Sequence, residues 1–129
     1  MEVLLITNVV IKNGEKVLLG RRTPHSKFFP NYWCIPGGKL EKNENPINSA
    51  IREIKEETGL KVKVTRLLEV SYQRYQKENC MIFLDFKAVP ITSKLEPIEK
   101  LVELRWFKKR EIDKIKMTQR DRKILKKYW

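Results

Sequence analysis

The stretch from residue 37 to residue 60, GGKLEKNENPINSAIREIKEETGL, predicts one helix with a defined start and a defined end. Asn45 has the side chain of a helix N-cap, and Pro46 suits the first helical position, where its missing N–H is not needed. Gly59 suits the left-handed residue that often follows the last turn. The sequence therefore predicts a helix over residues 46–58, preceded by a turn at Gly37 and Gly38.

This predicted helix has one apolar side and one acidic side. At about 100° per residue, four apolar residues share a core-facing stripe. They are Ile47, Ala50, Ile51 and Ile54. Glu53, Glu56 and Glu57 fall together on another side, where each pair of carboxylates three or four residues apart repels by about 0.2–0.5 kcal/mol. Arg52 and Lys55 could compensate as surface ion pairs, and a hard divalent cation, aided by a backbone carbonyl of the Gly-Gly turn, is the alternative.

Segments with the sequence pattern of strands precede and follow the predicted helix. Strands are predicted at residues 2–11, 17–22, 61–75, 79–90 and 102–107, and further helices at residues 109–115 and 119–129. Thr118 has the side chain to cap the last helix. The order strands, helix, strands, helix indicates an α/β or α+β sandwich rather than a regular βαβ winding. At 129 residues, the chain is expected to form one domain over residues 1–129.

The charge of the chain is strongly positive. Its 28 Lys and Arg against 16 Asp and Glu give a net charge of +12, which favours a polyanionic partner. Ten of the 28 basic residues lie between Lys108 and Lys127, so a basic helix is expected at about 118–129. Two cysteines are too few for a disulfide framework, and no apolar run approaches membrane length, so a cytoplasmic protein without membrane contact is expected.

The spacing of residues 37–60 resembles a complete Nudix box. The matching positions are Gly38, Glu44, Arg52, Glu53, Glu56, Glu57, Gly59 and Leu60. The segments VLLGRR, YWCIPGGKLE and ELRWF follow in the order seen in the Nudix hydrolase family, so the resemblance covers residues 2–115. It implies an α/β/α sandwich with a mixed β-sheet. It also implies cleavage of a nucleoside diphosphate linked to another group, with Mg²⁺ or Mn²⁺ as cofactor.

The resemblance also implies roles for single residues. Glu53, Glu56 and Glu57 match the glutamates that bind metal and supply the base, and the carbonyl of Gly37 or Gly38 matches a further metal ligand. Arg52 matches the arginine that orients the glutamates through an ion pair, whereas the role of Glu44 stays open.

The base and the last metal ligand have more than one candidate. Glu53 is the first choice as the group that accepts the proton of the attacking water, and Glu99 is the second. Family members often complete the metal site with an acidic residue before the late tryptophan, here Trp106. Glu99 and Glu103 are both candidates for that ligand.

Most candidate substrate-binding residues lie at the end of the second predicted strand and in the following loop. Arg22, with Arg21 as the fallback, matches an arginine that MutT-like relatives place against phosphates, which favours a nucleoside triphosphate cut to a monophosphate and pyrophosphate. Phe28 or Phe29 could stack on a base, and Asp121 could read it. The asparagine with which MutT proteins read guanine has no match, so specificity for oxidised guanine stays open.

Other substrates and roles remain possible from the sequence. ADP-ribose, a nucleotide sugar or a dinucleoside polyphosphate would use the same chemistry. The 5′ end of RNA would add phosphate contacts to the basic C-terminal helix, with a steep dependence on salt. A regulator that binds nucleotide without cleaving it is the alternative outside enzymes, although such proteins usually lose box glutamates. Many family members form homodimers, and no stretch of this sequence specifies one.

Overall fold

The computed structural model describes residues 1–96 and 100–129. Its elements are β1 (Val3–Asn13), β2 (Lys16–Arg22), β3 (Trp33–Cys34), β4 (Gly37–Lys39), α1 (Pro46–Thr58), β5 (Val62–Tyr75), β6 (Asn79–Pro90), β7 (Leu101–Lys108), the 3-10 helix η1 (Lys109–Lys114) and α2 (Gln119–Tyr128). The predicted helix at 46–58 is confirmed at both ends. The other predicted elements are present with small shifts of their ends, whereas the short strands β3 and β4 were not predicted.

The sheet is mixed, as the resemblance implied. Strand β1 pairs in parallel with β6, from Val3 opposite Cys80 to Ile11 opposite Ala88, and antiparallel with β2 and β4. Strand β5 extends the sheet beyond β6, while β3 and β7 both pair with β2. The central strand β1 therefore touches both halves of the sheet, and the Gly-Gly strand β4 lies directly against it.

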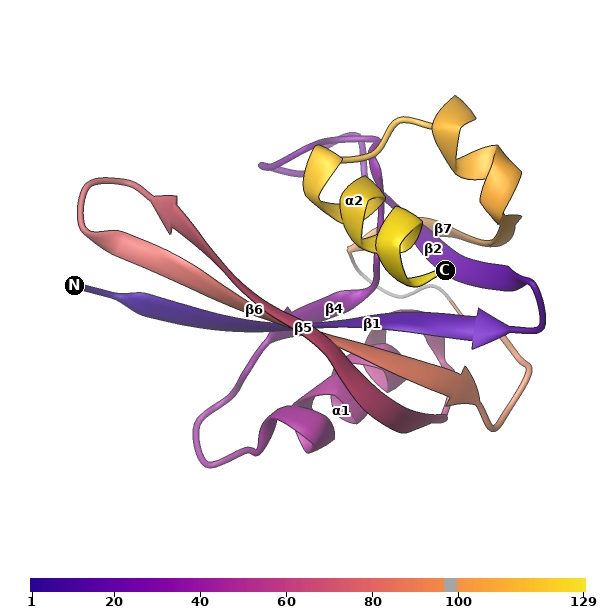
Figure 1. Ribbon diagram of the computed structural model, residues 1–129, viewed down its shortest axis with the longest axis horizontal. Helices are drawn as coiled ribbons and strands as arrows, with labels where there is room; N and C mark the ends of the chain where they lie inside the picture. Colours follow the sequence, from indigo (N-terminus) through magenta and orange to yellow (C-terminus); the bar gives the residue numbers. More distant parts are fainter. Residues whose placement is uncertain (97–99) are drawn as a thin grey trace.

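The two longer helices lie on opposite faces of this sheet (Figure 1). Val9 and Ile11 of β1 point toward α1 and pack in one core with Ile54, whereas Val10 points the other way and packs in a second core with Leu125 of α2. Successive side chains of a strand alternate between faces, so one buried strand supplies both cores. The α/β/α sandwich is thus observed.

Helix α1 begins and ends as the sequence predicts. The side chain of Asn45 accepts a hydrogen bond from the backbone N–H of Asn48 at 2.8 Å, and Gly59 has a φ of 80°. The predicted core stripe is correct at Ile54, which is fully buried, but wrong at Ile47, which is 49 % exposed. An open groove, lined in part by Phe86, lies beside the first turn of α1, so Ile47 has no sheet surface to cover it.

Helix α2 also has the predicted cap. Thr118 Oγ1 accepts a hydrogen bond from the backbone N–H of Asp121 at 3.3 Å, and Ile124 and Leu125 are buried. The segment before α2 meets β3, where the backbone N–H of Trp33 donates to the carbonyl of Lys116 at 2.8 Å. Among the helices that the structure describes, none is long and apolar enough to cross a bilayer.

Candidate active site

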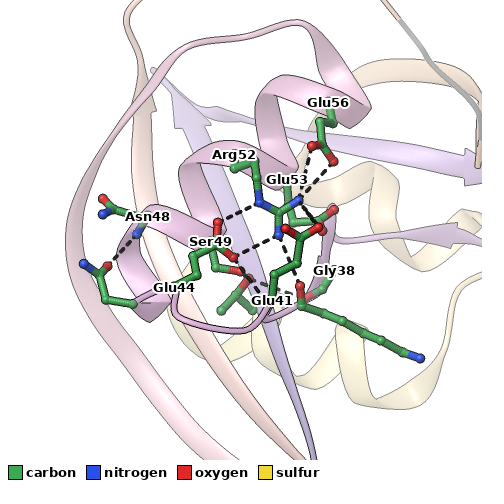
Figure 2. Close-up of polar contacts among 11 residues, drawn as sticks. Gly38, Glu41, Glu44, Asn48, Ser49, Arg52, Glu53 and Glu56 are labelled. Carbon is green, nitrogen blue, oxygen red and sulfur yellow. Dashed lines mark hydrogen bonds and ion pairs between the residues drawn. The ribbon is translucent and has the colours of Figure 1, made fainter.

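Arg52 occupies the centre of the acidic side of α1 (Figure 2). Its Nε lies 2.7 Å from Glu44 Oε2 and its Nη2 lies 3.0 Å from Glu44 Oε1. Its Nη1 lies 3.0 Å from Glu53 Oε1 and 3.1 Å from Glu56 Oε2. The Arg52 guanidinium therefore compensates part of the repulsion between the glutamates of α1.

Glu44 anchors that guanidinium from the loop before α1. Its carboxylate also accepts a hydrogen bond from the backbone N–H of Glu41 at 3.2 Å. The hydrogen bond from Arg52 is the main cause that holds the pKa of Glu44 below its usual value. The role that the sequence left open is thus a supporting one: Glu44 orders its own loop and orients Arg52.

Gly38 lies directly against the carboxyl group of Glu53. In β4 it is paired with Thr7 of β1, and a Cβ added to it would overlap the carboxyl group of Glu53. A Cβ on Gly37 would overlap the backbone of Thr7 and the side chain of Asn8. The Gly-Gly pair therefore lets the backbone of β4 approach both the central strand and the first box glutamate.

The glutamates of α1 differ in their surroundings. Glu53 is 8 % exposed and Glu57 is 7 % exposed, whereas Glu56 lies at the surface. Burial, and then the charge of Glu53, raise the pKa of Glu57 to about 8, while the charge of Lys100 opposes this shift. Glu57 is therefore a buried carboxyl group beside another carboxylate, and a cation would relieve both penalties.

The donor set fits a hard divalent cation. Carboxylate oxygens of Glu53, Glu56 and Glu57 and the carbonyl of Gly38 are the ligand types that Mg²⁺ and Mn²⁺ prefer. Within residues 1–96 and 100–129, however, no three acidic, His or Cys side chains converge as a ready ligand set. Arg52 Nη1 instead joins Glu53 to Glu56. Arg52 contacts only Oε1 of Glu53, which leaves Oε2 of Glu53 for a cation, whereas both oxygens of Glu56 contact Arg52 and Glu56 would have to turn to bind one.

Arg22, which the sequence proposes as a phosphate contact, lies at the end of β2 and is held there by the following loop. Its Nε donates to the carbonyl of Phe28 at 2.9 Å and to Ser26 Oγ at 3.2 Å, which ties the loop after β2 to the strand. Burial raises the pKa of Asp121, and Arg22 is among the groups whose charge opposes this. Its charge likewise opposes the raised pKa of Glu57. The charge of Arg22 thus acts on the pKa of both Glu57 and Asp121.

Arg21 and Glu103 lie in a different network. Arg21 Nε is 3.1 Å from Glu103 Oε1 and its Nη1 is 3.2 Å from Asn31 Oδ1. Arg105 Nη2 contacts the other oxygen of Glu103 at 2.7 Å, and these two arginines, Arg105 first, hold the pKa of Glu103 below its usual value. Both oxygens of Glu103 thus already have arginine partners. Glu99, the other candidate, lies outside the described residues.

The loop between β2 and β3 presents the predicted aromatic residues to solvent. Phe28 is 62 % exposed and Phe29 is 52 % exposed, and Phe29 has a φ of 48°. Its ring lies 5.2 Å from that of Tyr32 in a tilted arrangement. Both phenylalanines are free to meet a ligand, whereas Trp33 is buried in the core.

Asp121 is buried rather than part of the solvated basic face. Its Oδ2 accepts a hydrogen bond from the backbone N–H of Ile35 at 3.0 Å, and its Oδ1 lies 2.9 Å from Arg120 Nη1. Ile35 directly precedes Pro36 and the Gly-Gly strand, so this bond links α2 to the segment that carries Gly38.

The sequence reasoning missed Asp85 and Arg120. Asp85 is fully buried in β6 and pairs with Arg120 Nη2, while Arg120 also pairs with Asp121. The signal was present in the strand CMIFLDFKAV, where an acidic residue interrupts an apolar run. A charged group inside a buried strand requires a partner, and that requirement identifies such positions.

The fold and the site together define a class: α/β/α proteins with a Gly-Gly strand followed by a helix of box glutamates. The family model described as NUDIX domain matches residues 4–128. The chain therefore belongs to the Nudix domain family. Divalent metal ions are the cofactors that hydrolases of this family generally use.

Three relatives illustrate the match. The chain is 47 % identical over 59 residues to m7GpppN-mRNA hydrolase NUDT17 of Xenopus laevis, which is 46 % of this chain and 18 % of that protein. It is 32 % identical over 94 residues to human diphosphoinositol polyphosphate phosphohydrolase 2, which is 70 % of this chain and 50 % of that protein. The chain thus spans half or less of the length of these relatives. A NUDIX hydrolase structure from Nitrosomonas europaea has a TM-score of 0.85 at 24 % identity, over 99 % of this chain and 70 % of that one.

Proposed function

We propose that this protein hydrolyses a phosphoanhydride bond in a nucleoside diphosphate linked to a further group, with Mg²⁺ or Mn²⁺ as cofactor. The observation that carries the proposal is the pairing of Arg52 with Glu44, Glu53 and Glu56. These contacts gather the charged residues that define the box at one side of α1. A protein that only binds nucleotide would have no need of this acidic cluster.

The residues of the chain have separable tasks in this reaction. When bound, a divalent cation neutralises charge on phosphate oxygens and makes a nearby water more acidic. Glu53, Glu56 and Glu57 would hold it together with the carbonyl of Gly38. Glu53 is the proposed acceptor of the water's proton, because its carboxylate is buried against the Gly-Gly strand and is oriented by Arg52.

The proposed substrate is a nucleoside or deoxynucleoside triphosphate, cut to a monophosphate and pyrophosphate. Arg22 would contact the phosphates, since among the described residues its side chain donates only to Phe28 and Ser26, whereas Arg21 is already paired with Glu103. Asp121 of α2 and Phe29 of the loop between β2 and β3 would contact the base. The net charge of +12 adds a positive field that attracts the polyanion.

Product analysis tests this proposal. The purified protein is incubated with Mg²⁺ and with nucleoside triphosphates, ADP-ribose, a nucleotide sugar, a dinucleoside polyphosphate and a diphosphoinositol polyphosphate, and the products are separated by chromatography. Monophosphate and pyrophosphate from triphosphates are expected, with loss of both products in Glu56→Gln and Glu57→Gln. If Glu56→Gln and Glu57→Gln still cleave triphosphates as the parent does, the proposal is contradicted.

A 5′-RNA substrate is the second candidate. It is favoured by the 47 % identity to a relative named as an mRNA hydrolase and by the exposed basic residues of η1 and α2. RNA binding that uses several phosphates weakens steeply with salt, whereas binding of a free nucleotide weakens less. Hydrolysis of triphosphorylated or capped RNA with such a salt dependence, and of no free nucleotide, would replace the first candidate with the second.

A further inference from the structure

Two buried hydroxyl groups join α1 to the Gly-Gly strand β4. Thr7 of β1 and Ser49 of α1 are both fully buried. Their Oγ atoms lie 3.4 Å apart, and Thr7 Oγ1 donates to the carbonyl of Gly38, also at 3.4 Å. Gly38 in turn lies against Glu53, about one helical turn after Ser49 (Figure 2). A polar contact thus runs from α1 through β1 to the backbone of β4, beside the candidate metal site.

The direction of these hydrogen bonds follows from the number of protons. A carbonyl oxygen can only accept, so Thr7 must use its single hydroxyl proton to bond Gly38. Thr7 Oγ1 can then only accept from Ser49, which is therefore the donor. The order is Ser49 to Thr7 to Gly38, and Ser49 acts on the strand only through Thr7.

Apolar side chains would suit both positions at least as well as hydroxyl groups do. Ala is a better helix former than Ser and would fit the buried position of Ser49. Val has nearly the shape of Thr and is favoured in strands, so it would fit the position of Thr7. A buried hydroxyl is costly unless it is hydrogen-bonded. Two of them in contact beside the box glutamates therefore indicate a role in the site.

The hydroxyl contacts act on the separation between β4 and α1. A Cβ added to Gly38 would overlap the Glu53 carboxyl group, so this strand and this carboxylate are as close as a glycine allows. After accepting from Thr7, the Gly38 carbonyl has a second lone pair for a cation. The contacts of 3.4 Å are longer than the roughly 2.7–2.8 Å typical of O–H···O bonds. Hydrogen bonds in catalytic sites are often long before a ligand binds and shorten in the complex.

We propose that Thr7 and Ser49 are positioning residues for the cation. They hold the Gly38 carbonyl and the Glu53 carboxylate at the separation at which one cation can contact both. This inference rests on the proposed function, because it assumes the metal site, and it adds two uncharged side chains to that site.

Mn²⁺ binding to the protein without substrate, followed by the electron paramagnetic resonance signal of free Mn²⁺, tests the inference without catalysis. Thr7→Val keeps the shape and removes the hydroxyl, so its Kd for Mn²⁺ should rise about tenfold or more, as for other groups that orient metal ligands. Thr7→Ser keeps the hydroxyl and should bind Mn²⁺ as the parent does. Ser49→Ala should raise the Kd by a smaller factor, because Thr7 can still donate to Gly38.

The double variant Thr7→Val/Ser49→Ala tests the order of the hydrogen bonds. Because Ser49 acts only through Thr7, the double variant should bind Mn²⁺ no more weakly than Thr7→Val alone. The control is Thr65→Val. Thr65 Oγ1 also donates to a backbone carbonyl, that of Lys87 at 3.1 Å, but Thr65 belongs to β5. The Kd of this control should equal that of the parent.

Several results would overturn the inference. An unchanged Kd in Thr7→Val would do so, as would a Thr7→Ser variant that binds as weakly as Thr7→Val, or additive losses in the double variant. The Tm of each variant is measured alongside, because a merely structural role would lower Tm and leave the Kd of the folded protein unchanged. If Thr7→Val does not fold, Ser49→Ala decides: a raised Kd supports the inference and an unchanged Kd overturns it.

Glu57→Gln separates this inference from the proposed function. Mn²⁺ binding that is weakened in Glu57→Gln but unchanged in Thr7→Val would keep the proposed metal site and overturn the positioning role. Mn²⁺ binding that is weakened in both variants, by a parent that hydrolyses no phosphoanhydride substrate, would keep the positioning role and contradict the proposed reaction. A parent that binds no Mn²⁺ would overturn both.

Discussion

Glu44 accepts two hydrogen bonds from Arg52, from Nε at 2.7 Å and from Nη2 at 3.0 Å, although it lies eight residues earlier in the chain. Two parallel bonds fix the plane of a guanidinium as well as its position. The remaining Nη1 is thereby aimed at Glu53 and Glu56. The loop before α1 thus sets the orientation of the cation that organises the helix.

Glu44→Gln should impair the metal site without unfolding the protein. An amide cannot match the fork of a guanidinium with two acceptors, so Arg52 loses its fixed plane. Apparent Mg²⁺ affinity or kcat should fall about 10–100-fold, the usual range for residues that orient metal ligands. A Mg²⁺ titration of activity measures this. The matched control is Glu41→Gln, because Glu41 is 66 % exposed and 3.4 Å from Arg52; an equal loss in both variants would contradict the role of Glu44.

Removal of Arg52 should make the protein depend on divalent cations for stability. In Arg52→Gln, the carboxylates of Glu53, Glu56 and Glu57 lose their main counter-charge, so Tm without metal should fall. Added Mg²⁺ should raise the Tm of Arg52→Gln more than that of the parent, because ligand binding to the folded state stabilises it. Thermal unfolding with and without Mg²⁺ tests this. Lys55→Gln also removes a positive charge from α1, but Lys55 Nζ contacts the Gly59 carbonyl rather than a glutamate of the described helix, so this variant should behave as the parent does.

Gly38→Ala should abolish activity in a folded protein. The added Cβ would overlap the Glu53 carboxyl group, which must then leave the position against β4. We expect a fall in kcat of at least about 100-fold, since small displacements of reacting groups can cost that much. Gly14→Ala is the control, because Gly14 has a φ of 63° but no atom within 4 Å of an added Cβ. It should lose some stability and keep its activity.

Asp85 should make stability decrease as the pH rises above the usual pKa of an aspartate. Burial raises the pKa of Asp85, against the opposing charge of Arg120 and with the added effect of Asp121. Because the folded state holds its proton more tightly, this contribution is fully present below the unfolded pKa and is lost as pH rises through the folded pKa. Asp85→Asn should remove that part of the slope, and urea unfolding over mildly acidic to neutral pH measures it. An unchanged slope in the variant would contradict the prediction.

The apolar side of α1 should respond unevenly to truncation. Ile54→Ala should lower the free energy of unfolding by about 2–5 kcal/mol, because its side chain is fully buried in the core on that face. Ile47→Ala should cost under about 1 kcal/mol, since Ile47 lies beside an open groove. Urea unfolding of both variants gives the comparison, and equal losses would show that the groove is closed in solution.

The sequence alone was sufficient for features that depend on residues near one another in the chain. The limits of α1 follow from Asn45, Pro46 and Gly59, each of which acts through its own backbone or that of the next turn. The acidic side of α1 follows from helical periodicity, and the resemblance of residues 37–60 led correctly to the Nudix family. Local signals are reliable here because caps and periodicity are satisfied within a few residues.

The tertiary structure was needed wherever distant segments meet. Asp85, Arg120 and Asp121 come together only because β6 pairs with β1 and α2 packs across that face, and no local pattern contains this information. Ile47 was misjudged because its burial depends on what the facing strands leave open. Glu103 appeared equivalent to Glu99 in the sequence, yet the pairing of β7 with β2 places Glu103 opposite Arg21. Strand register, which is fixed by long-range packing, thus decides which charges become partners.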